Sequence, residues 1–200
     1  MKSIDRSEML SAVRGLFHEY PCRYWIAGGW ALDLFASRLR RQHSDVDVLV
    51  LARDLEQIAT TFDRRRPSVQ NPETGECRPW APGEQLVPGP NALVFPDHPY
   101  PIQILLAASD ADQWVYHRGS GTIRKPLDEI TLRSPDGLPY LAPEIVLLFK
   151  SRGGRPKDND DFADVAKLLD AERRRWLFDR IAPRYPEHPW LPTLRMRDLA

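Results

Sequence analysis

The chain has 200 residues, with 28 basic side chains, 28 acidic side chains and 42% hydrophobic residues. This length suits one large domain or two small ones with a substantial core. Zero net charge disfavours a dedicated nucleic-acid-binding protein, without excluding a local basic patch. No apolar run reaches the ~18–20 residues of a membrane span, and the N-terminus lacks the apolar core of a signal peptide. We therefore expect a cytoplasmic protein in which Cys22 and Cys77 are reduced thiols.

The first part of the chain predicts alternating helices and strands. In chain order these are a helix at 5–20, a strand at 24–27, a turn at Gly28-Gly29, a helix at 30–35, a basic loop at 37–44, a strand from 45 to about 50 and a helix at 55–62. Asp5 and Glu8 have capping-box spacing, and Asp54 is expected to cap the helix that follows it.

The second part changes in composition. Nine of the 19 prolines lie between Pro67 and Pro101, which predicts edge strands and loops because proline cannot donate to a central strand ladder. Strands are expected at 92–95, 102–106 and 114–116, and helices at 143–149, 158–169 and 172–182. The predicted fold is α/β (α+β): a mixed sheet flanked by helices at 1–137, with a proline-rich insertion at 67–101, and a C-terminal helical region at 138–200.

Two aspartates in one predicted strand are the strongest sign of chemistry. Asp45 and Asp47 alternate with Val46 and Val48, so both carboxylates face the same side, about 6–7 Å apart along the backbone. At about 4 Å between charged oxygens, their repulsion costs on the order of 4 kcal/mol at an effective dielectric near 20. A strand that keeps such a pair is expected to hold a cation, and Mg²⁺ prefers these oxygen ligands.

The glycine pair before the short helix adds a second sign. Gly28 and Gly29 follow a strand, where glycines let backbone N–H groups approach a phosphate and the helix N-terminus adds positive potential. A glycine pair by itself is more often a tight turn. Followed about sixteen residues later by Asp-x-Asp on a strand, it indicates an active-site scaffold.

The segment GGWALDLFASRLRRQHSDVD resembles the nucleotidyltransferase superfamily that includes DNA polymerase beta, and is most similar to its small aminoglycoside and lincosamide nucleotidyltransferase-like branch. The matching residues are Gly28, Gly29, Trp30, Ala31, Asp33, Arg38, Arg41, His43, Asp45 and Asp47. A second segment typical of this branch is YLAPEIVLLFKSRGGRPKDNDDF, from Tyr140 to Phe162.

The resemblance implies a mechanism and a set of site residues. Asp45 and Asp47 would hold two Mg²⁺ ions, and a substrate hydroxyl would attack the α-phosphate of ATP or another nucleoside triphosphate and expel pyrophosphate. The nucleotide-binding residues implied are Gly28, Gly29, Trp30, Arg38, Arg41, His43 and Lys150.

Several of these residues have an equally plain structural interpretation. Arg38 and Arg41 either meet phosphates or form ion pairs, for example with Asp33, and His43 more often orders its loop through a hydrogen bond. Lys150 either binds the triphosphate or is an ordinary helix-end lysine. Structural roles are favoured for two sets, a capping and salt-bridge cluster of Lys157, Asp158 and Asp161, and core aromatic residues Trp80, Trp114 and Tyr116.

One position departs from the family pattern. The superfamily takes a third carboxylate from a later strand, and Gln103 stands at that position in PIQILLAASDADQW. A glutamine can lend its carbonyl oxygen to a metal but cannot accept a proton as a carboxylate does. Either the alignment is shifted, or an acid such as Asp97, Asp110 or Asp112 replaces it, or catalysis is weak.

The leading hypothesis is a Mg²⁺-dependent enzyme that moves a nucleoside monophosphate, AMP from ATP, to a hydroxyl of a small molecule such as an aminoglycoside-like compound. One rival is a toxin-like nucleotidyltransferase that modifies tRNA or a protein. The other is a catalytically degenerate nucleotide-binding module, which Gln103 motivates.

Overall fold

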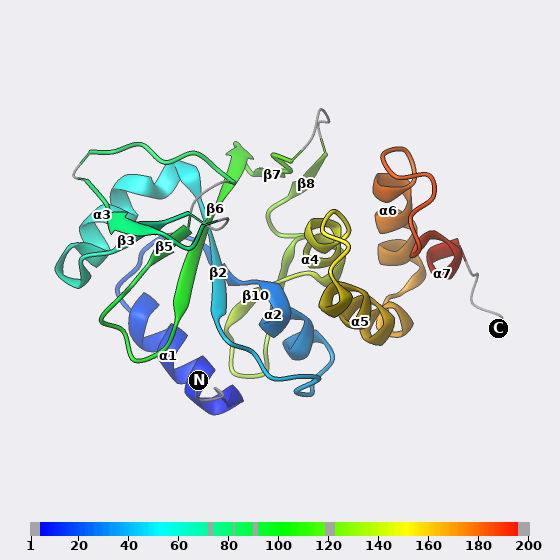
Figure 1. Ribbon diagram of the computed structural model, residues 1–200, viewed down its shortest axis with the longest axis horizontal. Coiled ribbons are helices and arrows are strands. Elements are labelled where there is room, and N and C mark those ends of the chain that lie inside the picture. Colours follow the sequence, from blue (N-terminus) through cyan, green and yellow to red (C-terminus); the bar gives the residue numbers. More distant parts are fainter. Residues whose placement is uncertain (1–4, 72–73, 82, 90–91, 119–122, 196–200) are drawn as a thin grey trace.

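A mixed β-sheet with helices on both faces organises the protein (Figure 1). The computed structural model describes residues 5–71, 74–81, 83–89, 92–118 and 123–195. The strands are β1 Tyr24–Ile26, β2 Val46–Leu51, β3 Ser68–Gln70, β4 Cys77–Pro79, β5 Ala92–Val94, β6 Ile102–Asp110, β7 Gln113–Val115, β8 Arg124–Pro126, β9 Thr131–Arg133 and β10 Pro139–Leu141. The helices are α1 Arg6–Phe17, α2 Gly28–Phe35, α3 Leu55–Phe62, α4 Pro143–Lys150, α5 Pro156–Val165, α6 Ala171–Ile181 and α7 Leu191–Arg195, with three short 3-10 turns at Ala52–Asp54, Asp63–Arg65 and Ala166–Leu168.

The two longest strands lie together at the centre of the sheet. The strand order is β4-β3-β5-β6-β2-β1-β10-β9, and β7 and β8 extend from the far end of β6. β2 runs parallel to β6 and antiparallel to β1, while β1 runs parallel to β10. Chain segments far apart in sequence therefore meet around β2.

One face of the central strands packs against α1 and α3. Tyr24 on β1 lies in register with Val50 on β2, and its ring stacks on Phe17 of α1 at 4.5 Å. Phe17 in turn meets Phe62 of α3 at 5.4 Å. Because side chains alternate along a strand, Asp47 and Leu49 point to the opposite face.

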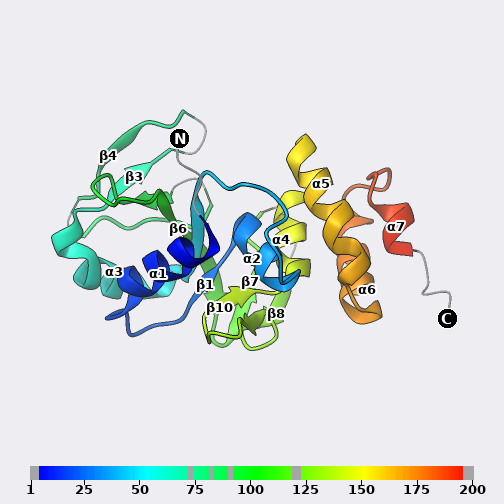
Figure 2. The same ribbon diagram turned by 90° about the horizontal axis from the view of Figure 1, so that it is seen from below.

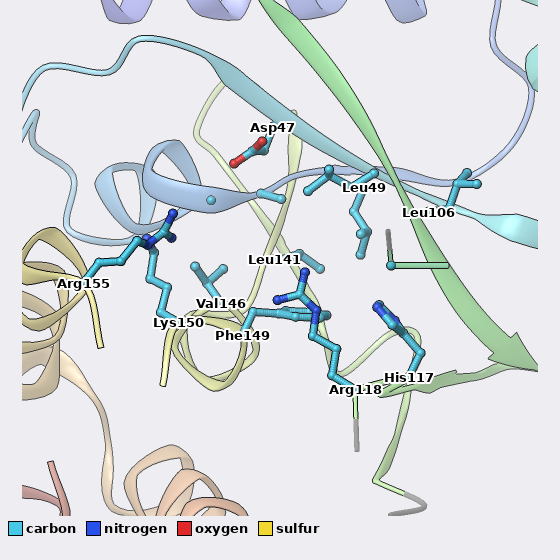
Figure 3. Close-up of a pocket in the computed structure, with 14 residues that line it drawn as sticks. Asp47, Leu49, Leu106, His117, Arg118, Leu141, Val146, Phe149, Lys150 and Arg155 are labelled. Carbon is cyan, nitrogen blue, oxygen red and sulfur yellow. The ribbon is translucent and has the colours of Figure 1, made fainter. Parts of the chain in front are cut away.

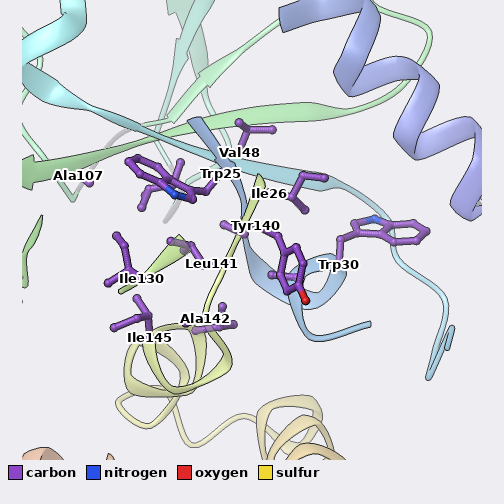
Figure 4. Close-up of a cluster of buried hydrophobic side chains, with 14 of the residues drawn as sticks. Trp25, Ile26, Trp30, Val48, Ala107, Ile130, Tyr140, Leu141, Ala142 and Ile145 are labelled. Carbon is purple, nitrogen blue, oxygen red and sulfur yellow. The ribbon is translucent and has the colours of Figure 1, made fainter. Parts of the chain in front are cut away.

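That opposite face is covered by α2 and α4. Trp25 and Leu141 from the sheet and Ile145 from α4 belong to one buried apolar cluster (Figure 4). Beyond α4, helices α5, α6 and α7 lie on the side away from α1 and α3 in both views (Figures 1 and 2). Phe162 of α5 stacks on Trp190 at 4.3 Å, which ties the C-terminal segment to this layer.

Local capping signals are confirmed at one helix and wrong at another. Asp5 and Glu8 form the predicted capping box at α1, with both backbone bonds present. Asp54 stands at the N-cap position of α3, but its side chain makes no capping hydrogen bond. Its backbone is not extended there because a 3-10 turn precedes the helix.

The proline-rich segment behaves as expected, whereas several short elements were not predicted. Strands β3, β4 and β5 form one end of the sheet, with β4 at its edge. Strands β8, β9 and β10 and helix α7 were missed, and β6 continues to Asp110, four residues beyond the predicted end of that strand. The sheet also continues past residue 137 because β10 pairs with β1, and the two-part division stays a prediction.

The sequence predicted that the chain has no membrane-spanning segment and that its two cysteines are reduced. Within them, no helix is both long enough and apolar enough to cross a membrane. Cys22 and Cys77 are both free, with Cys77 exposed.

Candidate active site

Asp47 lines a cavity between the sheet and α4. It is the second residue of β2, while Asp45 stands immediately before that strand. The indole N–H of Trp30 donates to the backbone oxygen of Asp45 at 3.1 Å and holds it beside α2. Both half-buried carboxylates are thus placed by β2 and by the start of α2.

The environment of Asp47 disfavours its charge. Burial and then the negative charge of Asp45 raise the pKa of Asp47 to about 6. The positive charges of Lys150, Lys157 and Arg155 oppose this shift without cancelling it. An acidic pair in this condition favours the binding of a cation, as its spacing in the sequence predicts.

The glycine pair permits the close approach of the site residues. Gly28 has φ +58, and a Cβ added there would lie 2.2 Å from Oδ2 of Asp47. A Cβ at Gly29 would lie 2.4 Å from the ring of His43. The prediction of a separate turn at the two glycines is wrong. They are the first two residues of α2, because β1 leads directly into this helix.

The beginning of α2 is also open to a ligand. Its N-cap is Ala27, which has no side chain able to accept the first N–H groups. The helix dipole and these N–H groups favour an anion at this end. Gly28 lines the same cavity as Asp47, so an anion here would lie beside the acidic pair.

Arg40 and His43 of the basic loop after α2 belong to a buried charge network. His43 shares a 2.7 Å hydrogen bond with Asp33, and its ring lies 4.6 Å from that of Trp30. Arg40 forms ion pairs with Asp33 at 2.7 Å and with Asp161 of α5 at 3.0 Å. His43 therefore has the structural contact favoured from the sequence, and Asp33 anchors an arginine, as expected.

Arg40, which the sequence did not single out, is the arginine that Asp33 anchors. Its side chain is only 1% exposed, whereas that of Arg38 is 63% exposed and lies 3.8 Å from Asp164. Arg41 binds Asp161 through its Nε at 3.0 Å. Sequence alone could not separate the three arginines, because their burial depends on α5, about 120 residues away.

Lys150 belongs to the same network. Its Nζ lies 2.7 Å from Asp158 and 2.9 Å from Asp161, and its side chain is 9% exposed. Burial acts to raise the pKa of Asp161, but the hydrogen bond from Arg41 and the charge of Lys150 outweigh it and hold that pKa well below its usual range. The predicted salt-bridge cluster is present for Asp158 and Asp161, while Lys157 is exposed.

Gln103 lies directly beside Asp47. The two residues are partners in the parallel register of β2 and β6, so their side chains emerge on the same face. The register thus places Gln103 next to one of the two aspartates, while its equivalence to the family's third carboxylate stays a prediction. An amide thus takes the place next to the acidic pair.

No acid replaces the missing carboxylate in the part of the chain that the structure describes. Those residues contain no group of three His, Cys, Asp or Glu side chains arranged to hold a metal. Asp110 ends β6, seven residues beyond Gln103, and pairs with Arg124 instead. Within the described residues, none of Asp97, Asp110 and Asp112 therefore joins Asp45 and Asp47 in such a three-residue group.

The cavity has a volume of about 180 Å³ and continues from Asp47 across the sheet (Figure 3). Leu49 and Leu141 line its sheet side, and Phe149 and Lys150 line its α4 side. Its other end is formed by His117 and Arg118, just after β7. These two residues carry no recognisable motif and were missed.

The three aromatic residues expected in the core lie in it or pack against it. Trp114 and Tyr116 are core residues, at 0% and 5% exposed. Trp80 packs against the edge of the core.

Comparisons with known proteins agree with this geometry. A family model described as aminoglycoside-2''-adenylyltransferase matches residues 9–74, about a third of the chain, and includes the glycine pair and both aspartates. The solution structure of the antibiotic-resistance factor ANT(2'')-Ia is similar with a TM-score of 0.59 at 15% identity, over 89% of this chain and 91% of that chain. The chain has the nucleotidyltransferase fold.

Two further solved structures share the nucleotidyltransferase fold. The lincosamide antibiotic adenylyltransferase LnuA is similar with a TM-score of 0.56 at 16% identity, over 84% of this chain and 100% of that chain. An antigenic nucleotidyltransferase-like protein from Paracoccidioides brasiliensis is similar with a TM-score of 0.50 at 16% identity, over 96% of this chain and 94% of that chain. No curated protein matches the sequence. The predicted resemblance to this superfamily and the predicted fold class are confirmed.

Proposed function

We propose that this protein transfers a nucleoside monophosphate, AMP from ATP, to a hydroxyl of a small molecule. The observation that carries the proposal is the arrangement of Asp47 and Gly28, which places one aspartate of the acidic pair and the uncapped start of α2 in the lining of one cavity. The first pattern favours a divalent cation and the second favours a phosphate. A nucleoside triphosphate with its cation satisfies both.

The residues present fit Mg²⁺. Asp45 and Asp47 offer carboxylate oxygens, and Gln103 beside Asp47 can offer an amide oxygen. When bound, Mg²⁺ would neutralise charge on the phosphates and leaving group. Three oxygen-bearing side chains suffice for one ion that keeps water and phosphate ligands, and a second ion would depend more strongly on the nucleotide itself.

The chain contributes position and charge. Backbone N–H groups at the start of α2 would bind phosphate oxygens, while Trp30 and the network around Asp161 hold the acidic pair and the basic loop in place. Lys150 and Arg155 line the phosphate side of the cavity, both held by Asp158. Because the side chains of Trp30 and His43 are buried, they would position the site residues rather than contact the nucleotide.

Gln103 favours a second candidate function, a nucleotide-binding module without catalysis. An amide beside Asp47 cannot take the proton of an attacking hydroxyl. The enzyme hypothesis then requires the acceptor to lose its proton without a third carboxylate, at a reduced rate. The aminoglycoside-like acceptor and the modification of tRNA or a protein remain alternatives for the substrate.

Labelled ATP, Mg²⁺ and a panel of hydroxyl compounds test the proposal. We expect slow pyrophosphate release in the presence of an acceptor, and a loss of at least about 100-fold in Asp45→Ala and Asp47→Ala, as for groups that stabilise transition-state charge. Gln103→Glu should raise turnover. Asp112→Asn, an exposed acid outside the cavity, serves as the matched control and should not change the rate.

The outcomes separate the two candidate functions. Nucleotide binding without pyrophosphate release in the wild type, together with release in Gln103→Glu, would identify a degenerate module. An unchanged rate in both alanine variants would rule out the proposed role of the acidic pair.

A further inference from the structure

The end of the cavity opposite Asp47 has a chemistry of its own. Arg118 and His117 follow β7, and Phe149 reaches the same place from α4 (Figure 3). The guanidinium carbon of Arg118 lies 5.3 Å from the centre of the Phe149 ring, and the His117 ring lies 5.9 Å from it. Flat groups from two elements thus surround one end of the cavity.

Arg118 differs from the other cations of the cavity. Lys150 and Arg155 are both paired with Asp158. Arg118 forms no ion pair with any residue that the structure describes, and its contact is the face of Phe149. Its charge and its hydrogen-bond donors are therefore available to a ligand.

His117 also lacks partners. Both ring nitrogens are buried and make no hydrogen bond within the described part of the chain. Burial, and then the charge of Arg118, lower the pKa of His117 to about 4, so the ring is neutral at neutral pH. Buried polar atoms in native proteins nearly always have a partner, so a bound polar group is a natural one here.

Acidic groups are scarce along this cavity. Among the described residues that line it, Asp47 is the one carboxylate, against the cations Arg118, Lys150 and Arg155. A ligand with several ammonium groups would meet Arg118 with no carboxylate beside it, which is electrostatically unfavourable. A flat ring can instead stack on Phe149 or on the guanidinium plane of Arg118.

We propose that Arg118, His117 and Phe149 form a recognition subsite for a flat ring that is uncharged or anionic, and that this subsite rejects polycationic ligands. The inference rests on the proposed function, because it names the chemical class of one ligand of the same cavity. The ring belongs either to the base of the nucleotide or to the acceptor, and the chemistry that recognises it is the same.

Direct binding measurements on the full chain test this subsite. The probes are ATP, tripolyphosphate (which has the phosphates without a base), a panel of uncharged and carboxylated aromatic alcohols, and tobramycin. The variants are Arg118→Met, which keeps the apolar stem, and Arg118→Glu, which reverses the charge. Arg175→Met, at an arginine 85% exposed on α6, is the matched control.

Two results support the proposal and identify the source of the ring. If the ring is the base, Arg118→Met lowers the affinity for ATP about tenfold and changes the affinity for tripolyphosphate by less than twofold. If the ring belongs to the acceptor, Arg118→Met leaves the affinities for ATP and tripolyphosphate unchanged and lowers the affinity for the aromatic alcohols about tenfold. In both cases tobramycin binds the wild type more weakly than it binds Arg118→Glu.

Two results would overturn it. One is that neither Arg118 variant changes the affinity of ATP or of any aromatic alcohol by more than the control does. The other is that tobramycin binds the wild type more tightly than the uncharged ligands and is unaffected by Arg118→Glu. Because these experiments measure binding, their outcome is independent of the transfer assay. The subsite can be refuted in a protein that transfers nucleotide, and it can be supported in a protein that releases no pyrophosphate.

Discussion

At the scale of single residues, Asp47 has the most consequential environment in the site. Its carboxylate stands beside Asp45 and close to the backbone of Gly28, and its pKa is raised from 3.8 to about 6. An acid whose pKa rises on folding binds its proton more tightly in the folded state. The protonated form of Asp47 therefore stabilises the folded protein. This stabilisation is fully present below pH 3.8 and is lost as the pH rises through about 6.

Asp47→Asn tests this loss of stability in the metal-free protein. The neutral amide should raise the free energy of unfolding by about 1–3 kcal/mol at pH 8, because it removes the charged form, and the gain should vanish near pH 4. Urea unfolding with a chelator present measures both values, with Asp112→Asn as the exposed control. A gain that is the same at both pH values would contradict the electrostatic explanation.

At the scale of elements, helix α2 depends on glycine at its first residue. The strand β1 delivers the chain to Gly28 with φ +58, at a point where Asp47 leaves no room for a side chain. The start of α2 and the position of Asp47 are therefore coupled.

Gly28→Ala should lower the free energy of unfolding by at least about 2 kcal/mol, since a left-handed residue and a displaced carboxylate both cost energy. Gly15→Ala is the matched control, because Gly15 lies within α1 with no atom within 4 Å of an added Cβ. This second change should stabilise the protein by about 0.5–1 kcal/mol. Urea unfolding of both variants checks the opposite signs, and equal effects would refute the argument.

At the scale of the whole molecule, Asp161 connects helix α5 to the loop that leads into β2. It lies on α5 and receives Arg40 and Arg41 from the loop before β2, as well as Lys150 from the end of α4. Its side chain is 1% exposed, so these charges satisfy one another inside the protein. The network joins the two segments of the chain on which the family resemblance was based.

Asp161→Asn should lower the free energy of unfolding by about 1–3 kcal/mol, because Arg41 loses its carboxylate, whereas Arg40 keeps Asp33 and Lys150 keeps Asp158. Asp164→Asn, three residues later on the same helix and 43% exposed, should change it by less than about 0.5 kcal/mol. Chemical denaturation compares the two variants. A loss in Asp161→Asn as small as that in Asp164→Asn would show that the network contributes nothing to stability.

The parts of the site that could be predicted are those that depend on the spacing of residues close together in the sequence. Asp45 and Asp47 lie two residues apart, and the pattern of alternating valines predicts a strand with one functional face, which β2 has. Alternation along the strand at 102–106 likewise put Gln103 on the face opposite to Ile102 and Ile104, and the register of β6 places it beside Asp47. In contrast, the short strands β8 to β10 carry too few residues for a pattern, and their pairing comes from distant parts of the chain.

The sequence by itself determined the family resemblance and the acidic pair, because these depend on residues near one another in the chain and on the period of a strand. Only the tertiary structure decided that Arg40 is the buried arginine, that Lys150 is held by Asp158 and Asp161, and that Arg118 and His117 share the cavity with Asp47. Burial and ion pairing depend on which distant segments meet, and no local pattern encodes those contacts.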